Sequence, residues 1–559
     1  STAARWEPPR GASQVAEQSA AAGEAERPPR AVRSPLSALA AEIRDLADLP
    51  LRIASAQACD WSADRNTSSS INVNDDAMTV RLRAGDCRLE ILSEGEIEFS
   101  DDDADVARIA RGGFLEIEER QGNVTRRLEV SARNGGLERR WWVNGREAQY
   151  DADARAWLAR MLPVVFRRTG LDAERRAARI LQRGGADALL QETALIPSDW
   201  AARQYYTVLL SRPDLDPGTL RRVVQQAGRE IASDYELAEL LISVARHQTV
   251  DENVRLAYVE ATGQIQSSYE RRRALTAVLT RGGLSAELAD AMLQQSVGIT
   301  SDFEAAELLI EVVGARAPGT PLPAAFWQAV DGIQSSYERR RVLHAVVQRS
   351  AGNQVVLDSV LASGAGVKSD YERTELLIAV AQQYPTDRSL PASYVRAVGT
   401  MSSGFELRRA LDALVKRPGV TAPMLVSVLQ AAQNVRGDYE RAELLVNVLK
   451  GYPLTDAIRQ PFFNAAAGIK GDFEHARVLK AVIARGDLDS ATVRALLGAA
   501  AGIASDYELA EILVAVARAA PIGEDLRPDF LKAADGIKSD HERGRALNAL
   551  YRRGTRADD

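Results

Sequence analysis

Hydrophobic positions change their spacing several times along the chain, and these changes divide it into five segments. Residues 1–35 contain almost no periodic apolar positions and are rich in Ala, Pro, Glu and Arg, which is typical of a disordered tether. Apolar residues follow a helical spacing over 36–57, as a helical lead-in would, and alternate with polar residues over 58–150. Beyond this point the spacing is helical again. We therefore expect a helical connector or N-terminal cap over 151–197 and α-solenoid repeats over 198–559.

The segment 58–150 has the two-residue period of half-buried strands. Apolar and polar residues alternate over 78–82, for example, and Gln-Gly at 121–122 and Asn-Gly at 144–145 stand where tight hairpins need residues that tolerate positive φ. The pattern predicts a small antiparallel β domain, built as a meander of six to eight strands.

Cys59 and Cys87 are the two cysteines of the chain, and both lie in the β segment. A disulfide between them would stabilise the domain by about 3.5 kcal/mol, because it restricts the unfolded loop. Such a bond is typical of an oxidising compartment. Two unpaired buried thiols are the alternative. We predict the disulfide and, with it, a periplasmic or extracellular location.

One aromatic position recurs through the helical segment, and we call its members the marker residues. The first step between markers is 35 residues and the following ones are 34. The markers are Trp200, Tyr235, Tyr269, Phe303, Tyr337, Tyr371, Phe405, Tyr439, Phe473 and Tyr507, with His541 in the last place. A fixed period of this length is the signature of stacked helical hairpins. The sequence thus predicts a mainly α fold, an α-solenoid of about eleven 34-residue hairpins preceded by the β domain. Tetratricopeptide repeats share the period but have a different residue pattern, so we expect a tetratricopeptide- or HEAT-like solenoid of its own type.

Each unit also carries signals for the ends of its helices. Ser233-x-x-Glu236 and its equivalents match a capping box, in which the serine accepts from a free helix N–H and the glutamate reaches back to the cap. A glycine five residues before a marker matches a Schellman stop, whose glycine is left-handed. These glycines are Gly298, Gly332, Gly366, Gly468, Gly502 and Gly536.

Charge adds a second period, of 68 residues. Four residues after the marker, from the second unit on, Glu and Arg alternate: Glu239, Arg273, Glu307, Arg341, Glu375, Arg409, Glu443, Arg477, Glu511 and Arg545. Stacked helices lie about 8–10 Å apart, which these side chains can bridge. We predict an inter-repeat charge ladder that fixes the register, because like charges would meet if units of one type were adjacent. A ligand-binding row of charges is the alternative.

Every second unit has a further aromatic residue 23 positions after its marker. The members are Tyr258, Phe326, Tyr394, Phe462 and Phe530. Two interpretations stay open: these side chains fill the core, or they line a groove that receives a partner.

The sequence contains no recognisable active-site motif. Zinc peptidase, phosphate-loop, dinucleotide and nucleophile-elbow motifs are missing from the sequence. The four histidines, His247, His344, His475 and His541, lie in separate repeats. We therefore predict no catalytic residue, metal ligand or cofactor. The aspartates within 101–105 form either a solvated loop or a cation site with oxygen ligands.

Length and charge restrict the classes of protein further. At 559 residues the chain is too long for one hydrophobic core. Its net charge of -7 gives no overall attraction to nucleic acid or an anionic membrane. No apolar run approaches the ~20 residues of a membrane-spanning helix. The first residue is not Met, which leaves a removed signal peptide or membrane anchor open.

The sequence resembles a known bacterial extracytoplasmic region. The resemblance covers roughly 58–550 and is carried by GEIEFSDDDADVARIARGGFLEIEE (95–119), WWVNGREAQYD (141–151), ARAWLARMLPVVFRRTG (154–170) and the SDYE repeats that follow. This region occurs alone or after the membrane zinc metallopeptidase domain of antirepressor-type proteins related to β-lactam sensor-transducers. The resemblance implies a β domain joined to a solenoid. It implies no catalytic role here, because the peptidase motif is missing.

Three functions remain after these observations. The first is a non-enzymatic extracytoplasmic scaffold that binds a protein or peptide through the solenoid surface, because solenoids present extended binding surfaces. The second is the sensor or regulatory region of a membrane signalling protein of the antirepressor type, with a ligand in the β domain. The third is a hydrolase that uses carboxylates of the β domain. The oligomeric state is open.

Overall fold

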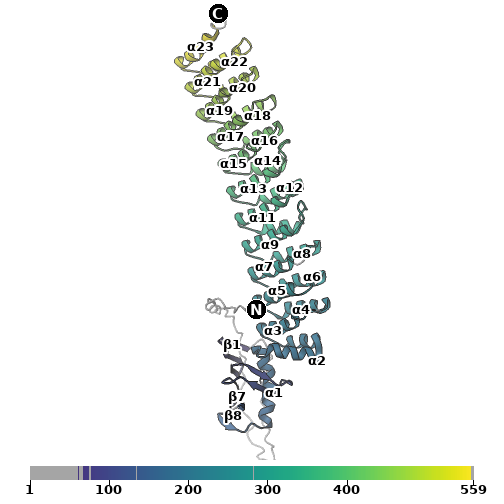
Figure 1. Cartoon of the computed structure of the whole chain (residues 1–559). Helices are drawn as coiled ribbons and strands as arrows, with labels where there is room; N and C mark the ends of the chain where they lie inside the picture. Colours follow the sequence, from purple (N-terminus) through teal and green to yellow (C-terminus); the bar gives the residue numbers. More distant parts are fainter. Residues whose placement is uncertain are drawn as a thin grey trace, which may run out of the picture. The chain divides into compact units, whose positions relative to one another are not determined.

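The structure is a computed structural model that describes Cys59, Trp61 and residues 67–74, 77–133, 135–213, 215–280 and 283–554. The predicted tether over 1–35 and helical lead-in over 36–57 lie outside the described residues. Nine strands are followed by twenty-three helices in the described ranges (Figure 1). This confirms the predicted fold class, a mainly α solenoid after a small antiparallel β domain. No helix in these ranges is long and apolar enough to cross a bilayer.

All strand pairs of the β domain are antiparallel, as predicted. The strands are β1 (Thr67–Asn74), β2 (Ala77–Ala84), β3 (Cys87–Glu94), β4 (Ile97–Phe99), β5 (Val106–Ile109), β6 (Phe114–Gln121), β7 (Val124–Arg133), β8 (Gly136–Val143) and β9 (Arg146–Ala148). Seven of them form one sheet in the order β1-β2-β3-β6-β7-β8-β9, and β4 pairs with β5 separately. The seven strands of the main sheet agree with the predicted meander of six to eight, whereas the separate two-stranded ribbon, which interrupts it, was not predicted.

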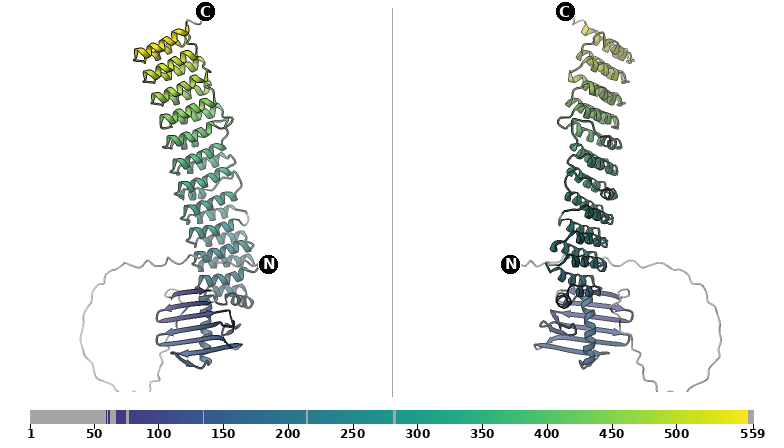
Figure 2. Two further views of the ribbon diagram at one scale, coloured as in Figure 1. Left: turned by 60° about the vertical axis from the view of Figure 1, so that its left-hand side comes forward. Right: turned by 90° about the vertical axis from the view of Figure 1, so that its right-hand side faces the viewer.

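The inner face of the sheet forms one core with helix α1 (Ala152–Thr169). A cross-strand row of apolar residues runs through Val80, Ile91, Ile117 and Leu128, all of them buried. Helix α1 lies along this face (Figure 2) and adds buried side chains, among them Trp157. The register of the strands therefore sends one face of the sheet into the core and the other to solvent.

The predicted connector over 151–197 is shared between two hydrophobic cores. Helix α1 belongs to the core of the β domain, whereas α2 (Ala173–Thr193) contributes to the core of the solenoid. Between them, Gly170 adopts a left-handed φ of 67° and ends α1. A Cβ on this glycine would lie 2.4 Å from the ring of Trp200, so the close approach also requires glycine.

Helices of the solenoid alternate between two layers, which Figure 1 shows as two columns side by side. The first layer contains α3 (Asp199–Leu210), α5 (Asp234–His247), α7 (Ser268–Leu279), α9 (Asp302–Ala315), α11 (Ser336–Arg349), α13 (Asp370–Gln383), α15 (Gly404–Val415), α17 (Asp438–Gly451), α19 (Asp472–Arg485), α21 (Asp506–Ala519) and α23 (Asp540–Gly554). The second layer contains α4 (Pro217–Glu230), α6 (Glu252–Thr262), α8 (Ala286–Ser296), α10 (Ala324–Gly332), α12 (Gln354–Gly364), α14 (Ala392–Gly399), α16 (Ala422–Ala432), α18 (Asp456–Ala466), α20 (Ser490–Ala500) and α22 (Arg527–Ala534). The described residues thus contain ten complete hairpins and the first helix of an eleventh unit.

In the predicted capping boxes, the hydrogen bond from the serine forms, but the glutamate does not reach back to the cap. Ser233 caps α5, since its side chain accepts from the N–H of Glu236. The carboxylate of Glu236, however, pairs with Arg203 of the preceding repeat. The backbone N–H of Ser233 donates instead to Asp199 of that repeat, at 2.7 Å. The residues of the box therefore cap one helix and also join neighbouring repeats.

The predicted left-handed glycine stops are wrong. None of the six glycines has a positive φ. At Gly298 the reason for glycine is space, because a Cβ there would collide with the guanidinium of Arg271. That guanidinium donates to the carbonyls of Gly263, Ile265 and Gln295, near the ends of α6 and α8. An arginine side chain thus satisfies carbonyls that a Schellman turn would have satisfied.

Candidate interaction surface

The marker side chains form a row of partly exposed aromatic rings, one in each repeat. Each marker is the second residue of its first-layer helix, so all of them present the same helical face. The exposed fraction runs from 47% at Trp200 to 67% at Phe473 over ten successive units. The sequence showed the period of these residues but not their exposure, which depends on where the apolar stripe of each helix faces. We call this row the aromatic row.

Arginine side chains lie over several of these rings. The guanidinium carbon of Arg341 is 5.7 Å from the ring centre of Phe303, and that of Arg409 is 5.5 Å from the ring centre of Tyr371. In each case the arginine belongs to the repeat that follows the aromatic residue. Such cation–π contacts are worth about 0.5–1 kcal/mol at exposed sites. They hold the rings in place while half of each ring remains open to solvent.

The predicted charge ladder is present as separate pairs. Each ladder glutamate pairs with the arginine 34 residues later, at 2.7 Å for Glu239–Arg273 and Glu375–Arg409 and at 2.5 Å for Glu307–Arg341 and Glu443–Arg477; Glu511 pairs with Arg545 in the same way. Each of these arginines also pairs with a glutamate of its own helix, three residues earlier. The second acceptor explains why the arginine does not reach forward to the next ladder glutamate.

A continuous ladder, in which Glu375 would be flanked by two arginines, is therefore not formed. Glu375 pairs with Arg409, whereas Arg341 is held by Glu307 and Glu338. The remaining repeat interfaces have ion pairs that the sequence analysis missed: Arg203–Glu236, Arg272–Glu304, Arg340–Glu372, Arg408–Glu440 and Lys480–Glu508. In the first four of these pairs the signal was an arginine three positions after every second marker, whereas Lys480 lies seven positions after Phe473.

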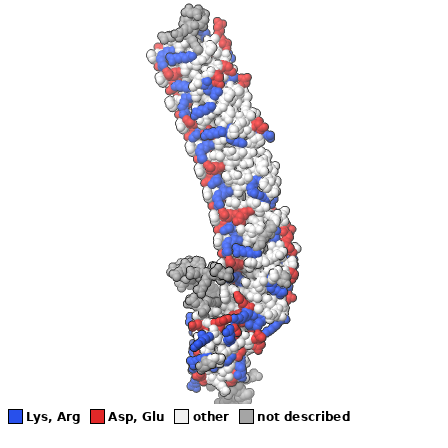
Figure 3. All heavy atoms as spheres, viewed as in Figure 1, with Lys and Arg blue, Asp and Glu red and all other residues white. Residues whose placement is uncertain are grey.

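The two sets of ion pairs alternate along the first layer, beside the aromatic row. Residues three and four positions apart share one face of a helix, so each marker lies next to the charged positions that follow it. Figure 3 shows acidic and basic side chains interspersed along the stack. The resulting surface offers aromatic rings with charges of both signs between them, which suits a polypeptide better than a polyanion.

Reversing both charges of one inter-repeat ion pair should restore stability that a single reversal removes. Glu375→Arg should destabilise the stack, because it removes the acceptor of Arg409 in the preceding repeat and places a second arginine beside it. Adding Arg409→Glu should recover part of the loss. Both partners are about one-third exposed, so we expect a coupling energy of about 0.5–1 kcal/mol. Thermal unfolding of the single and double variants in low salt measures it. A coupling energy of zero would show that the pairs do not stabilise the stack.

The five aromatic residues considered as groove lining are core residues. Tyr258, Phe326, Tyr394, Phe462 and Phe530 are each 0% exposed. They lie in second-layer helices that pack against the first layer, so the groove interpretation is wrong. Burial raises the pKa of the hydroxyl groups of Tyr258 and Tyr394. The hydroxyl of Tyr258 donates to the carbonyl of Ala274, which satisfies it inside the core.

Two aspartates of the acidic loop in the β domain form ion pairs with arginines. Asp103 pairs with Arg176 at 2.6 Å and with Arg179 at 2.8 Å, and both arginines come from α2. Asp105 pairs with Arg139 of β8 at 3.0 Å. The loop thus joins the β domain to the first helix of the solenoid core. Within the described ranges, no three His, Cys, Asp or Glu side chains are grouped so that they could hold a metal ion.

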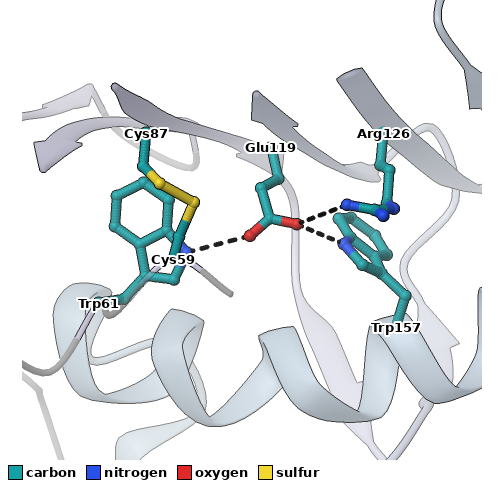
Figure 4. The surroundings of a disulfide bond; sticks show 6 residues. All are labelled: Cys59, Trp61, Cys87, Glu119, Arg126 and Trp157. Carbon is teal, nitrogen blue, oxygen red and sulfur yellow. Dashed lines mark hydrogen bonds and ion pairs between the residues drawn. A yellow bond between two sulfur atoms is a disulfide. The ribbon is translucent and has the colours of Figure 1, made fainter. Parts of the chain in front are cut away.

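The β domain has a second polar feature next to its disulfide. Cys59 and Cys87 are bonded, as predicted. Beside them, Figure 4 shows the buried carboxylate of Glu119 between two tryptophans. The indole N–H groups of Trp61 and Trp157 donate to it at 3.2 and 2.8 Å, and Arg126 lies 3.7 Å away. This arrangement leaves the carboxylate no open side for a substrate, so we assign it a structural role.

No protein-family model and no curated protein matches this sequence. Among solved structures, the chain is similar to a "Circular tandem repeat protein with novel repeat topology and enhanced subunit contact surfaces". The two share 14% sequence identity, and the match covers 72% of this chain and 82% of that chain with a TM-score of 0.12. At this level of similarity we draw no conclusion about function from the match.

Proposed function

We propose that this protein is a non-enzymatic interaction scaffold that acts outside the cytoplasm and binds a protein or peptide through the solenoid surface. The aromatic row carries this proposal. Ten successive repeats each keep a large ring about half exposed at the same position. Exposing aromatic rings to water is unfavourable, and aromatic residues are enriched at the centres of protein interfaces.

Two further observations support this function. The Cys59–Cys87 disulfide is compatible with an oxidising compartment outside the cytoplasm. Two aspartates of the acidic loop, Asp103 and Asp105, which a hydrolase would need free, pair with arginines. As part of this proposal, the chain is an extracytoplasmic region of the type that follows the membrane peptidase domain in antirepressor-type proteins.

The second candidate function is that of a sensor or regulatory region with a ligand in the β domain. A specific feature favours it, because the solvent face of the sheet contains a basic hollow lined by three arginines. The two functions are compatible, since the hollow and the aromatic row lie on different parts of the chain.

Site-specific crosslinking tests the scaffold. A photoreactive phenylalanine analogue in place of Tyr337 should capture a polypeptide from the extracytoplasmic fraction of the native cell. The same analogue at Val355, an exposed apolar position in the second layer, should not. The triple change of Phe303, Tyr337 and Tyr371 to alanine should then weaken binding of the captured partner by at least about tenfold without loss of helical content.

Equal capture from both positions would contradict a specific surface on the first layer. Unchanged binding by the triple variant would remove the aromatic row from the proposal. Replacing the exposed Val297 and Val355 by alanine is the control, because it shortens exposed apolar side chains away from the aromatic row.

A further inference from the structure

The solvent face of the β sheet contains a basic hollow that neither the fold nor the scaffold function explains. Two adjoining open depressions of about 500 and 550 Å³ share Arg83, Arg88 and Arg120 in their lining. The depression of about 500 Å³ reaches Ser70 of β1, and the one of about 550 Å³ reaches Thr125 of β7. All three arginines are exposed. We call this feature the arginine hollow.

The strand register places the three arginines directly beside one another. Arg83 of β2 is opposite Arg88 of β3, and Arg88 is opposite Arg120 of β6. Side chains at directly opposed positions are separated by about 5 Å at Cβ. Three guanidinium groups therefore form one line across three strands, and like charges in this position destabilise a sheet. An anion bound along this line would relieve the repulsion.

Other charges near the line do not neutralise it. Among the described residues, the side chains of Arg83 and Arg88 make no hydrogen bond or ion pair, and the side chain of Arg120 reaches only the hydroxyl of Thr125, at 3.4 Å. Nearby carboxylates are Glu90, which pairs with Arg81 at 2.7 Å, together with Glu118 and Asp86. The depression that reaches Ser70 thus has four arginines and two glutamates in its lining, and the one that reaches Thr125 has three arginines and one aspartate. Both have an excess of positive charge.

Elsewhere on this face, arginines have acidic partners. Arg140 pairs with Glu147 at 3.1 Å, and Arg133 pairs with Glu138 at 3.1 Å. The unpaired arginines are thus confined to the end of the sheet formed by the β2–β3 and β6–β7 turns. This contrast separates the arginine hollow from an ordinary solvated surface.

We propose that the arginine hollow binds a small dissolved molecule that carries two or more phosphate groups in a row. Guanidinium groups donate paired N–H bonds that match phosphate oxygens in geometry. A single phosphate carries a charge of about -2, which is less than three arginines can accept. A chain of phosphates places an anionic group against each arginine in turn. This site is independent of the aromatic row.

Calorimetric titration of the full chain with tripolyphosphate tests this site. At constant ionic strength we expect saturable binding with one molecule per chain. Arg88→Gln removes the central guanidinium and should weaken binding by at least about tenfold. The matched control is Arg133→Gln, which removes the same charge from the same domain and should change the affinity by less than about twofold.

In low salt, Arg88→Gln should also raise the melting temperature of the protein, because it relieves the repulsion between the arginines. If Arg88→Gln fails to fold, Arg120→Gln replaces it.

Several results would overturn the proposal. One is the absence of binding to the wild-type chain, or equal binding by Arg88→Gln. Inorganic phosphate that binds as tightly would refute the requirement for several phosphates, and citrate that binds as tightly would refute phosphate as the ligand class. Binding only to heparin, or only to vesicles that contain phosphatidic acid, would indicate a polymer or a membrane in place of a small dissolved molecule.

Discussion

Glu119→Ala is expected to lower the free energy of unfolding of the β domain by about 3–5 kcal/mol. The carboxylate is the shared acceptor for the indole N–H groups of Trp61 and Trp157, both of which are buried. Each donor left without an acceptor costs about 1–3 kcal/mol, and the lost packing adds to this. Chemical unfolding followed by tryptophan fluorescence measures the change, since both indoles report on the site.

Glu118→Ala is the matched control, because Glu118 is the neighbouring residue of β6 and faces the solvent side of the sheet. It should change stability by less than about 0.5 kcal/mol. Glu119→Gln keeps one oxygen acceptor and should fall between the two. Similar losses for the alanine changes at 118 and 119 would show that the two indoles do not depend on the carboxylate.

The prediction of the β domain from sequence was limited by contacts between distant segments. Leu115 and Ile117 alternate inward, and the same alternation carries Glu119 into the core. The pattern could therefore have marked this carboxylate as buried. Its partners, however, lie 58 and 38 residues away in the chain, and nothing in the local pattern pairs them.

In the solenoid, the sequence predicted the features that depend on contacts within one repeat. Helix starts, the apolar stripe and the period of the hairpins depend on neighbours within about one turn, so they were predicted correctly. The charge pairs depend on which of two glutamates an arginine reaches. Arg341 can reach forward, back or along its own helix, and the structure shows contacts back to Glu307 and along the helix to Glu338. Charge alternation alone does not distinguish these geometries.

Phe326→Ala is expected to destabilise the solenoid locally by about 3–5 kcal/mol. The side chain is 0% exposed and packs edge-on against Trp327, with ring centres 5.3 Å apart. Its removal leaves a cavity that the surrounding helices fill only in part. Because repeats contact only their neighbours, the loss should be confined to the units around α10. Native-state hydrogen exchange, which resolves local opening, should show reduced protection from α8 to α12.

Phe303→Ala makes the same chemical change 23 residues earlier, at a marker position that is 50% exposed. We expect it to cost less than about 1.5 kcal/mol, which covers the contact with Arg341 and the smaller buried area. The two variants together separate the aromatic residues that build the solenoid from those that remain available to a partner. If Phe303→Ala were as destabilising as Phe326→Ala, the stack itself would require the aromatic row. The exposure of these rings would then no longer favour an interaction surface, and the scaffold function would lose the observation that carries it.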